Sequence, residues 1–185
     1  MKKIRIPIIT PIFALAFLYI DFSLYTLIIF LSALLHECGH LIFMSAFGVG
    51  IEKIIILPVG ARIIEKQSLI SYGKEIIISA GGCIFNLLIF LLFYKSFPVF
   101  ACTNLFFFTL NILPIYSLDG GRIVRLISTM RYNPEKAERT VHRVSFVFSV
   151  ILWVFGVYIM LCLKGNLSLF ALSLFLITNE LVVIK

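Results

Sequence analysis

The chain alternates long apolar runs with short polar loops. Six apolar segments can be drawn, at about residues 4–20, 22–47, 75–94, 99–115, 144–163 and 167–184. Most of them approach the roughly 20 residues that an α-helix needs to cross the hydrocarbon core of a bilayer. The pattern predicts an all-α polytopic membrane protein with about six transmembrane helices, in which residues 1–185 form one domain. The first segment has no small-residue cleavage site, so we expect a retained helix rather than a signal peptide.

Two segments depart from this pattern. Residues 51–65 contain two β-branched runs around Pro58, Val59 and Gly60, which predicts a small β-hairpin at the cytoplasmic surface. An irregular interfacial loop is the alternative. Residues 131–141, RYNPEKAERTV, are the one plainly hydrophilic stretch, and we expect a cytoplasmic loop or a short helix there.

Composition and charge exclude several classes of protein. Hydrophobic residues make up 61% of the chain and charged residues 14%, against about 25% charged in a soluble domain. A soluble enzyme and a disordered chain are both excluded. The net charge of +7 does not indicate a nucleic-acid partner, because the basic residues sit in short loops and form no basic face.

The basic residues also predict an orientation. With six spans and the N-terminus inside, all of the 16 Lys and Arg residues except Lys95 and Lys164 lie on the inner side. Basic residues concentrate in cytoplasmic loops, so we expect both termini in the cytoplasm.

Polar groups inside an apolar span are the strongest functional signal, because each is costly in a bilayer. The second segment contains His36-Glu37-Cys38-Gly39-His40. Residues four apart share one face of a helix, so both imidazoles can reach one metal ion, and Glu37 lies beside the first of them. This is the H-E-x-x-H arrangement of zinc peptidases. The alternative is a pair of buried, hydrogen-bonded histidines.

A catalytic zinc site needs a third protein ligand and an open fourth position. His142 is a poor candidate because it lies in the basic loop. Asp119, within NILPIYSLDGGRI at residues 111–123, is the better candidate. An N-cap role for Asp119 at the following helix is the alternative.

Asp119 and the histidines can meet only if the fourth segment is not a straight helix. Counted from Val99, Asp119 would lie about 30 Å along such a helix, whereas His36 lies about 16 Å before Phe47. Because proline ends or kinks a helix, we expect a break at Pro114.

Together these motifs resemble the site-2 protease family of intramembrane metalloproteases. His36, Glu37 and His40 match its H-E-x-x-H, Asp119 matches the Asp of its N-x-x-P…L-D-G motif, and Gly82 and Asn86 match its G-x-x-x-N. Asn111 and Pro114 complete the second motif. The short form with LPVGA after the second span looks most like the stage IV sporulation factor-processing type.

The resemblance implies a zinc endopeptidase that cleaves a membrane-bound substrate within or next to a transmembrane segment. Glu37 would act as the catalytic base. Asn86 and Asn111 would support substrate or the transition state, although each could simply bond between helices. It also implies a bacterial cell membrane and a possible inhibitory or gating membrane partner. No PDZ or C-terminal regulatory domain is expected.

Two other functions stay open at this point. A membrane metal-ion transporter could use the same ligands without needing Glu37 as a base. A catalytically inactive binding scaffold could keep the fold, but it would need neither the ligand set nor Glu37.

Overall fold

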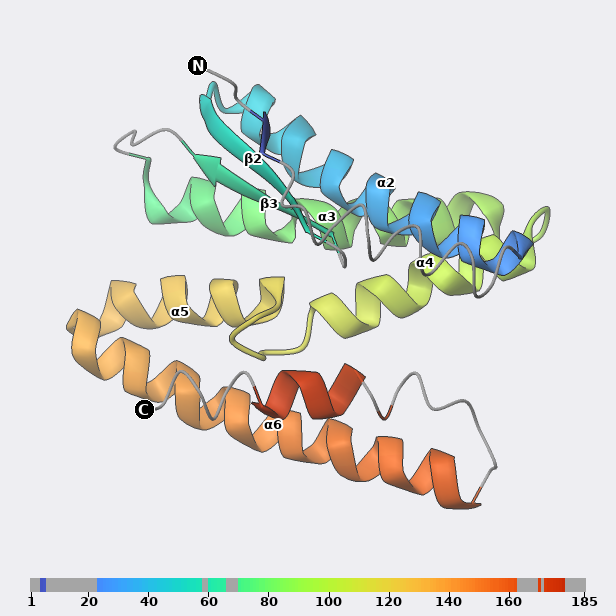
Figure 1. Cartoon of the computed structure of the whole chain (residues 1–185). Coiled ribbons are helices and arrows are strands. Elements are labelled where there is room, and N and C mark those ends of the chain that lie inside the picture. The colour runs from blue at the N-terminus through green and yellow to red at the C-terminus, as the bar shows by residue number, and fades with distance from the viewer. Residues whose placement is uncertain are drawn as a thin grey trace. The chain divides into compact units, whose positions relative to one another are not determined.

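The computed structural model describes residues 4–5, 23–57, 60–65, 70–162, 170 and 172–178, with residues 4–5, 51–57 and 60–65 described at the level of the backbone. The chain divides into two compact units, Met1–Thr109 and Leu110–Lys185. Figure 1 shows the elements of both.

The first unit contains strands β1 (Ile4–Arg5), β2 (Ile51–Leu57) and β3 (Gly60–Glu65) and helices α2 (Leu24–Ala46), α3 (Tyr72–Phe93) and most of α4 (Pro98–Asn111). Ser23 caps the start of α2, where its side chain accepts a hydrogen bond from the Thr26 N–H. After α2, Gly48 has a φ of 67°, a left-handed conformation that commonly ends a helix. Both signals agree with the predicted segment at 22–47.

Helices α2 and α3 pack closely because glycines face each other across their contact. A Cβ atom on Gly39 would lie 2.5 Å from the Gly81 carbonyl oxygen, and one on Gly81 would lie 2.9 Å from the Gly39 oxygen. Small residues let membrane helices approach to backbone contact. Met44, Val49 and Ile78 form a buried cluster beside this contact.

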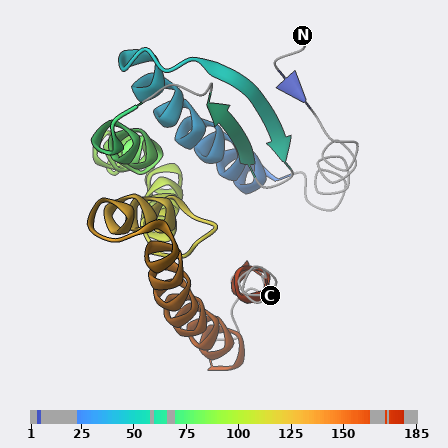
Figure 2. The same cartoon turned by 90° about the vertical axis from the view of Figure 1, so that its left-hand side faces the viewer.

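Strands β2 and β3 pair antiparallel, with Ile54 opposite Ile63 and Ile55 opposite Arg62, and β1 pairs parallel with β2. The strand order is β1-β2-β3, and both views show β2 and β3 alongside α2 (Figures 1 and 2). The segment predicted as a hairpin therefore has hairpin pairing, while its turn at 58–59 lies outside the described residues. The expectation of a helix starting near Ile4 was wrong for Ile4 and Arg5, whose backbone pairs with β2 instead.

Helix α4 is linked to α2 by a buried hydrogen bond. The Asn104 side-chain amide donates to Ser32 Oγ at 3.0 Å and to the Phe100 carbonyl oxygen at 2.8 Å. Both side chains are fully buried. The predicted fourth span at 99–115 was too long, because α4 ends at Asn111, three residues before Pro114. A break near Pro114 is confirmed.

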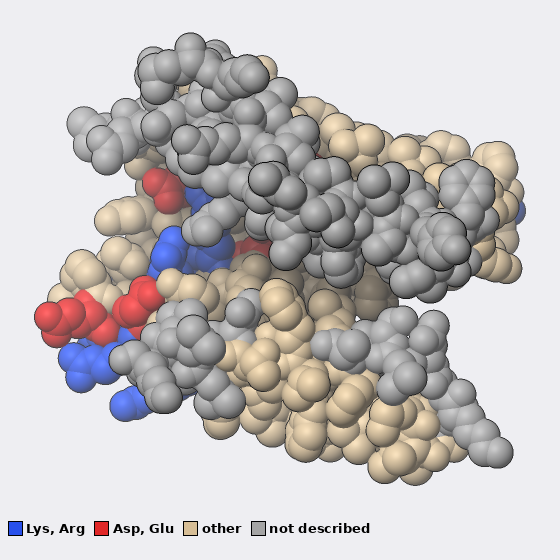
Figure 3. Space-filling view, in the orientation of Figure 1, with Lys and Arg blue, Asp and Glu red and all other residues tan. Residues whose placement is uncertain are grey.

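The second unit contains α5 (Asp119–Arg131) and α6 (Pro134–Cys162), with further helical residues among 170 and 172–178. The hydrophilic stretch 131–141 is neither a loop nor a separate short helix. It forms the end of α5, a two-residue break and the first turns of α6, because Pro134 suits the first position of a helix. Figure 3 shows the charged side chains of this unit gathered where α5 meets α6.

Three of the described helices are long and apolar enough to cross a membrane, namely α2, α3 and α6. The 14 residues of α4 reach only about 21 Å, less than the roughly 30 Å of a bilayer core. The chain is a multi-pass integral membrane protein. The predicted first and sixth spans lie mostly outside the described residues.

Candidate metal centre

Helix α2 places two imidazoles against each other. His36 and His40 are one helical turn apart, and their Nε2 atoms lie 3.2 Å from each other. The ring centroids are 4.9 Å apart with an interplanar angle of 84°. Two nitrogen ligands at 2.0–2.1 Å from a tetrahedral zinc ion would be separated by roughly 3.3 Å. The distance between the two Nε2 atoms therefore fits one shared metal ion.

The neighbouring helix orients one of these rings. His40 Nδ1 lies 2.8 Å from the backbone carbonyl oxygen of Ile78 on α3. A carbonyl oxygen can only accept, so Nδ1 is the donor and carries the proton. A neutral His40 ring then has its lone pair on Nε2, the atom that faces His36.

Glu37 follows His36 directly on α2 and is half-buried. A carboxylate at this position lies beside the first histidine of the pair. The three residues of the predicted motif thus share one stretch of one helix, as their spacing indicated.

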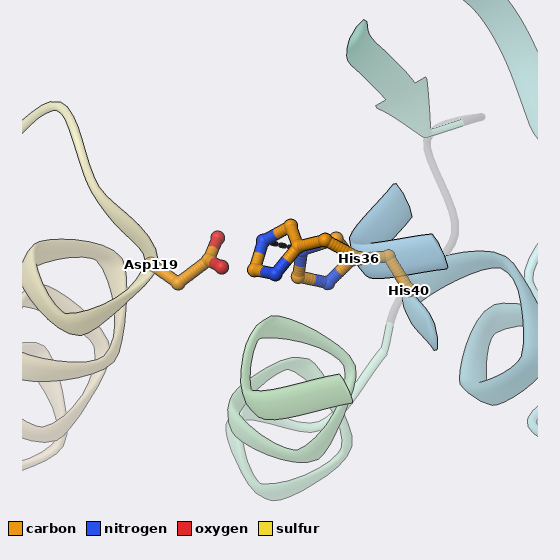
Figure 4. A group of neighbouring side chains, drawn as sticks. All are labelled: His36, His40 and Asp119. Carbon is orange, nitrogen blue, oxygen red and sulfur yellow. Dashed lines mark hydrogen bonds between the residues drawn. The ribbon is translucent and has the colours of Figure 1, made fainter. Parts of the chain in front are cut away.

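Asp119 is the first residue of α5. Figure 4 draws it with the two histidines of α2, and these three residues are the candidate metal ligands. The alternative of an N-cap role was wrong, since Leu118 holds the cap position and makes no side-chain cap hydrogen bond. The Asp119 carboxylate instead belongs to the first turn of α5, whose helix dipole favours negative charge.

The turn before Asp119 is fastened to α6. The Tyr116 N–H donates to Ser145 Oγ at 2.7 Å, and the Tyr116 ring stacks on His142 with centroids 4.6 Å apart and an interplanar angle of 19°. His142 also lies 3.5 Å from a Glu138 carboxylate oxygen. His142 therefore supports the turn, in keeping with its rejection as a metal ligand.

The environment of Tyr116 also changes its acidity. Partial burial raises the pKa of its phenol, and a hydrogen bond to Glu138 and that residue's negative charge raise the pKa further, while Arg125 opposes them. The neutral phenol is thus the form that this cluster stabilises.

The chain is similar to known peptidases. The model of Peptidase family M50 matches residues 93–152, which include Asn111 and Asp119. A zinc metalloprotease of Methanocaldococcus jannaschii is 27% identical over 162 residues, covering 80% of this chain and 46% of the relative.

Over residues 93–152 the chain is similar to peptidase family M50. Stage IV sporulation protein FB of Bacillus subtilis is 24% identical over 161 residues, covering 81% of this chain and 55% of that protein. The chain thus spans about half the length of the curated relatives it matches. The solved structure of a site-2 protease from Methanocaldococcus jannaschii matches with a TM-score of 0.69 and 23% identity, over 96% of this chain and 88% of that one. It shows that the fold is the same.

Two asparagines of the site-2 protease motifs lie in different settings. Asn111 is the last residue of α4 and is half-buried. Asn86 lies on α3 and is fully buried, yet neither atom of its amide group has a hydrogen-bond partner among the described residues. A buried amide without a partner is costly. The structure therefore offers no support for Asn86 as a bond between the described helices.

Several contacts of the candidate ligands and of the helices that carry them were not found from the sequence. The Ile78 carbonyl carries no signal in a sequence, because every residue has one. Ser145 and Tyr116 are 29 residues apart, and no local pattern pairs them. Asn104 and Ser32 could have been found, because both are polar residues inside apolar segments, the same signal that picked out the histidines.

Proposed function

We propose that this chain is a zinc-dependent endopeptidase that cleaves a peptide bond within or next to a transmembrane segment of a membrane-bound substrate. The observation that carries the proposal is the histidine pair on an apolar helix, with Nε2 atoms 3.2 Å apart and Glu37 beside it. Similarity to peptidase family M50 and to a zinc metalloprotease adds to it.

His36, His40 and Asp119 are the proposed zinc ligands. A catalytic zinc site takes three protein ligands and leaves the fourth position open. Two imidazoles and a carboxylate are ligands that zinc prefers in proteins. Asp119 also sits at the start of α5, where the helix dipole favours a negatively charged side chain.

Glu37 is the proposed catalytic base. When bound, zinc supplies a Lewis acid that lowers the pKa of water toward about 7 and polarises a carbonyl oxygen. Glu37 then accepts a proton from the attacking water and later passes it to the leaving amine. Its place next to His36 suits this role.

Asn86 and Asn111 are proposed to hold the substrate. The two amide atoms of Asn86 that lack partners among the described residues can donate to and accept from an unwound peptide backbone. A substrate would satisfy them, which gives a reason for keeping a costly buried amide. Asn111 ends α4, eight positions before Asp119, and would orient the substrate near that carboxylate.

The substrate must unwind before cleavage, because a transmembrane helix hides its carbonyl groups in its own hydrogen bonds. Strand β3 would provide partners for the unwound segment by β-augmentation, since β2 already lies between β1 and β3. By analogy with stage IV sporulation protein FB, the substrate class would be a membrane-bound sporulation or signalling factor. A membrane partner would gate access to the site.

The test uses a reporter with one transmembrane helix joined to a fluorescent domain, with an Asn-Gly pair in the helix to ease unwinding. The wild-type chain should release the fluorescent domain when the two are co-expressed. Glu37→Gln should reduce release of the fluorescent domain by about 10²–10⁴-fold. The variant should still bind about one zinc ion per chain. Equal release by the two proteins would show that Glu37 is not the base and would contradict the proposal. A metal-ion transporter needs no base and would release no domain with either protein.

The strand can be tested separately by a proline scan. A proline in β3 removes one N–H donor from the edge without touching the candidate ligands. About every second position from Ala61 to Ile64 should lower cleavage, because alternate N–H groups point outward. Prolines that never lower cleavage in well-expressed protein would show that β3 does not bind substrate.

A further inference from the structure

Helix α3 meets the histidine pair at a glycine. A Cβ atom built on Gly82 would lie 2.6 Å from His36 Cε1, from His36 Nε2 and from His40 Nε2. Real Cβ atoms essentially never approach heavy atoms so closely. The two facing nitrogens can therefore occupy their places only because residue 82 has no side chain.

The same helix touches His40 from a second direction. Ile78 lies one turn before Gly82 on α3, and its carbonyl oxygen accepts the hydrogen bond from His40 Nδ1 at 2.8 Å. Ile78 is 1% exposed, so water does not compete for this carbonyl. A partner on the distal nitrogen fixes both the tautomer and the tilt of a ligating imidazole.

Close helix packing keeps both contacts in place. Gly39 on α2 and Gly81 on α3 let the backbones of these two helices come together beside the histidines. A wider separation would lengthen the bond to the Ile78 carbonyl and leave a gap over Gly82. The two contacts thus depend on one helix–helix distance.

We infer that the Ile78–Gly82 turn of α3 positions the two histidines for zinc, with the Ile78 carbonyl setting the His40 tautomer and Gly82 providing the space in which the two Nε2 atoms converge. This inference rests on the proposed function, because it assumes that His36 and His40 bind zinc. Gly82 and Ile78 are positioning residues and do not touch the metal or the substrate.

The first test compares Gly82→Ala with Gly73→Ala in the full chain purified in detergent. Gly73 is also a glycine of α3, but nothing lies within 4 Å of a Cβ atom built there. Gly82→Ala should weaken zinc affinity by about 10–100-fold in a competition titration, as loss of a ligand's supporting contact does elsewhere. It should also change the visible absorption of the Co²⁺-substituted protein, whereas Gly73→Ala should change neither.

The second test needs no substitution that could disturb folding. In the metal-free wild-type chain labelled with ¹⁵N-histidine, the ring nitrogen shifts report which nitrogen of His40 carries the proton. We expect the proton on Nδ1, with the signal assigned by its loss in His40→Ala. A proton on Nε2 would overturn the inference, even if Gly82→Ala lowers both zinc affinity and thermal stability.

The outcomes separate this inference from the proposed function. If the wild type binds no zinc, the proposed function fails and takes the inference with it. If the wild type binds zinc and cleaves the reporter, but Gly82→Ala binds zinc with the same affinity and the same Co²⁺ spectrum, only the positioning role fails.

Discussion

The candidate histidines and the candidate aspartate are held by two different kinds of structure. His36 and His40 lie one turn apart on a 23-residue helix, so the helix itself brings them together. Asp119 begins α5 after a seven-residue turn, and that turn is fixed by Tyr116 bonding to Ser145 of α6. The histidine geometry is therefore local in sequence, whereas the place of Asp119 depends on a partner far along the chain.

The largest effect is expected from removing both histidines of α2. His36→Ala combined with His40→Ala should reduce zinc from about one ion per chain to almost none, because one carboxylate alone cannot hold the ion. Metal analysis of purified protein measures this. His142→Ala is the matched control, since it removes a histidine that supports the turn but is not a candidate ligand, and it should keep most of the zinc. Full zinc in the double variant would refute the assignment of both ligands.

Asp119→Asn tests the candidate ligand that follows the turn before α5. The substitution keeps the shape of the side chain but removes its charge. We expect zinc affinity to fall by more than the roughly 10–100-fold that loss of a ligand's supporting hydrogen bond costs, with folding retained. A competition titration checks this. Unchanged affinity would mean that the third ligand is another residue.

The contrast between the two structures also explains what could be predicted from the sequence. The second and third spans and the H-E-x-x-H face follow from spacing along single helices, and α2 and α3 lie close to the predicted ranges. The break before Pro114 was predicted because proline acts locally. The length of α6 was not, since the hydrophilic stretch at 131–141 continues as its first turns.

Long-range contacts account for most of what was missed. The His40 bond to Ile78 joins residues 38 apart, and the Tyr116 bond to Ser145 joins residues 29 apart. Neither partner belongs to a motif, and a backbone carbonyl has no side-chain signature. The pairing of β1 with β2 likewise joins the start of the chain to residues 54 and 55. A single sequence contains no record of such pairings.

Gly121→Ala should destabilise the turn that precedes Asp119. Gly121 is buried, and a Cβ atom there would fall on the carbonyl group of Ile115. Because a backbone atom cannot move aside as a side chain can, the free energy of unfolding should fall by at least the roughly 1–3 kcal/mol typical of overpacking. An SDS titration in mixed micelles measures it. Gly73→Ala, at an open and exposed helix position, should be neutral or slightly stabilising, and equal effects of the two would contradict this account of the turn.

The smallest effect is expected from removing one hydrogen bond of the turn before Asp119. Ser145→Ala takes away the acceptor of the Tyr116 N–H, and Ser145 is fully buried. A buried donor that loses its partner costs about 1–3 kcal/mol, so the unfolding midpoint should fall. Ser149→Ala is the matched control, one turn further along α6. Ser149 is equally buried, but its hydroxyl has no hydrogen-bond partner among the described residues, so its loss should cost little.

If the two variants lost equal stability, the bond to Tyr116 would not be what fastens the turn. If Ser145→Ala alone is less stable and also binds zinc more weakly, the place of Asp119 depends on α6, as the comparison with the helix-borne histidines requires.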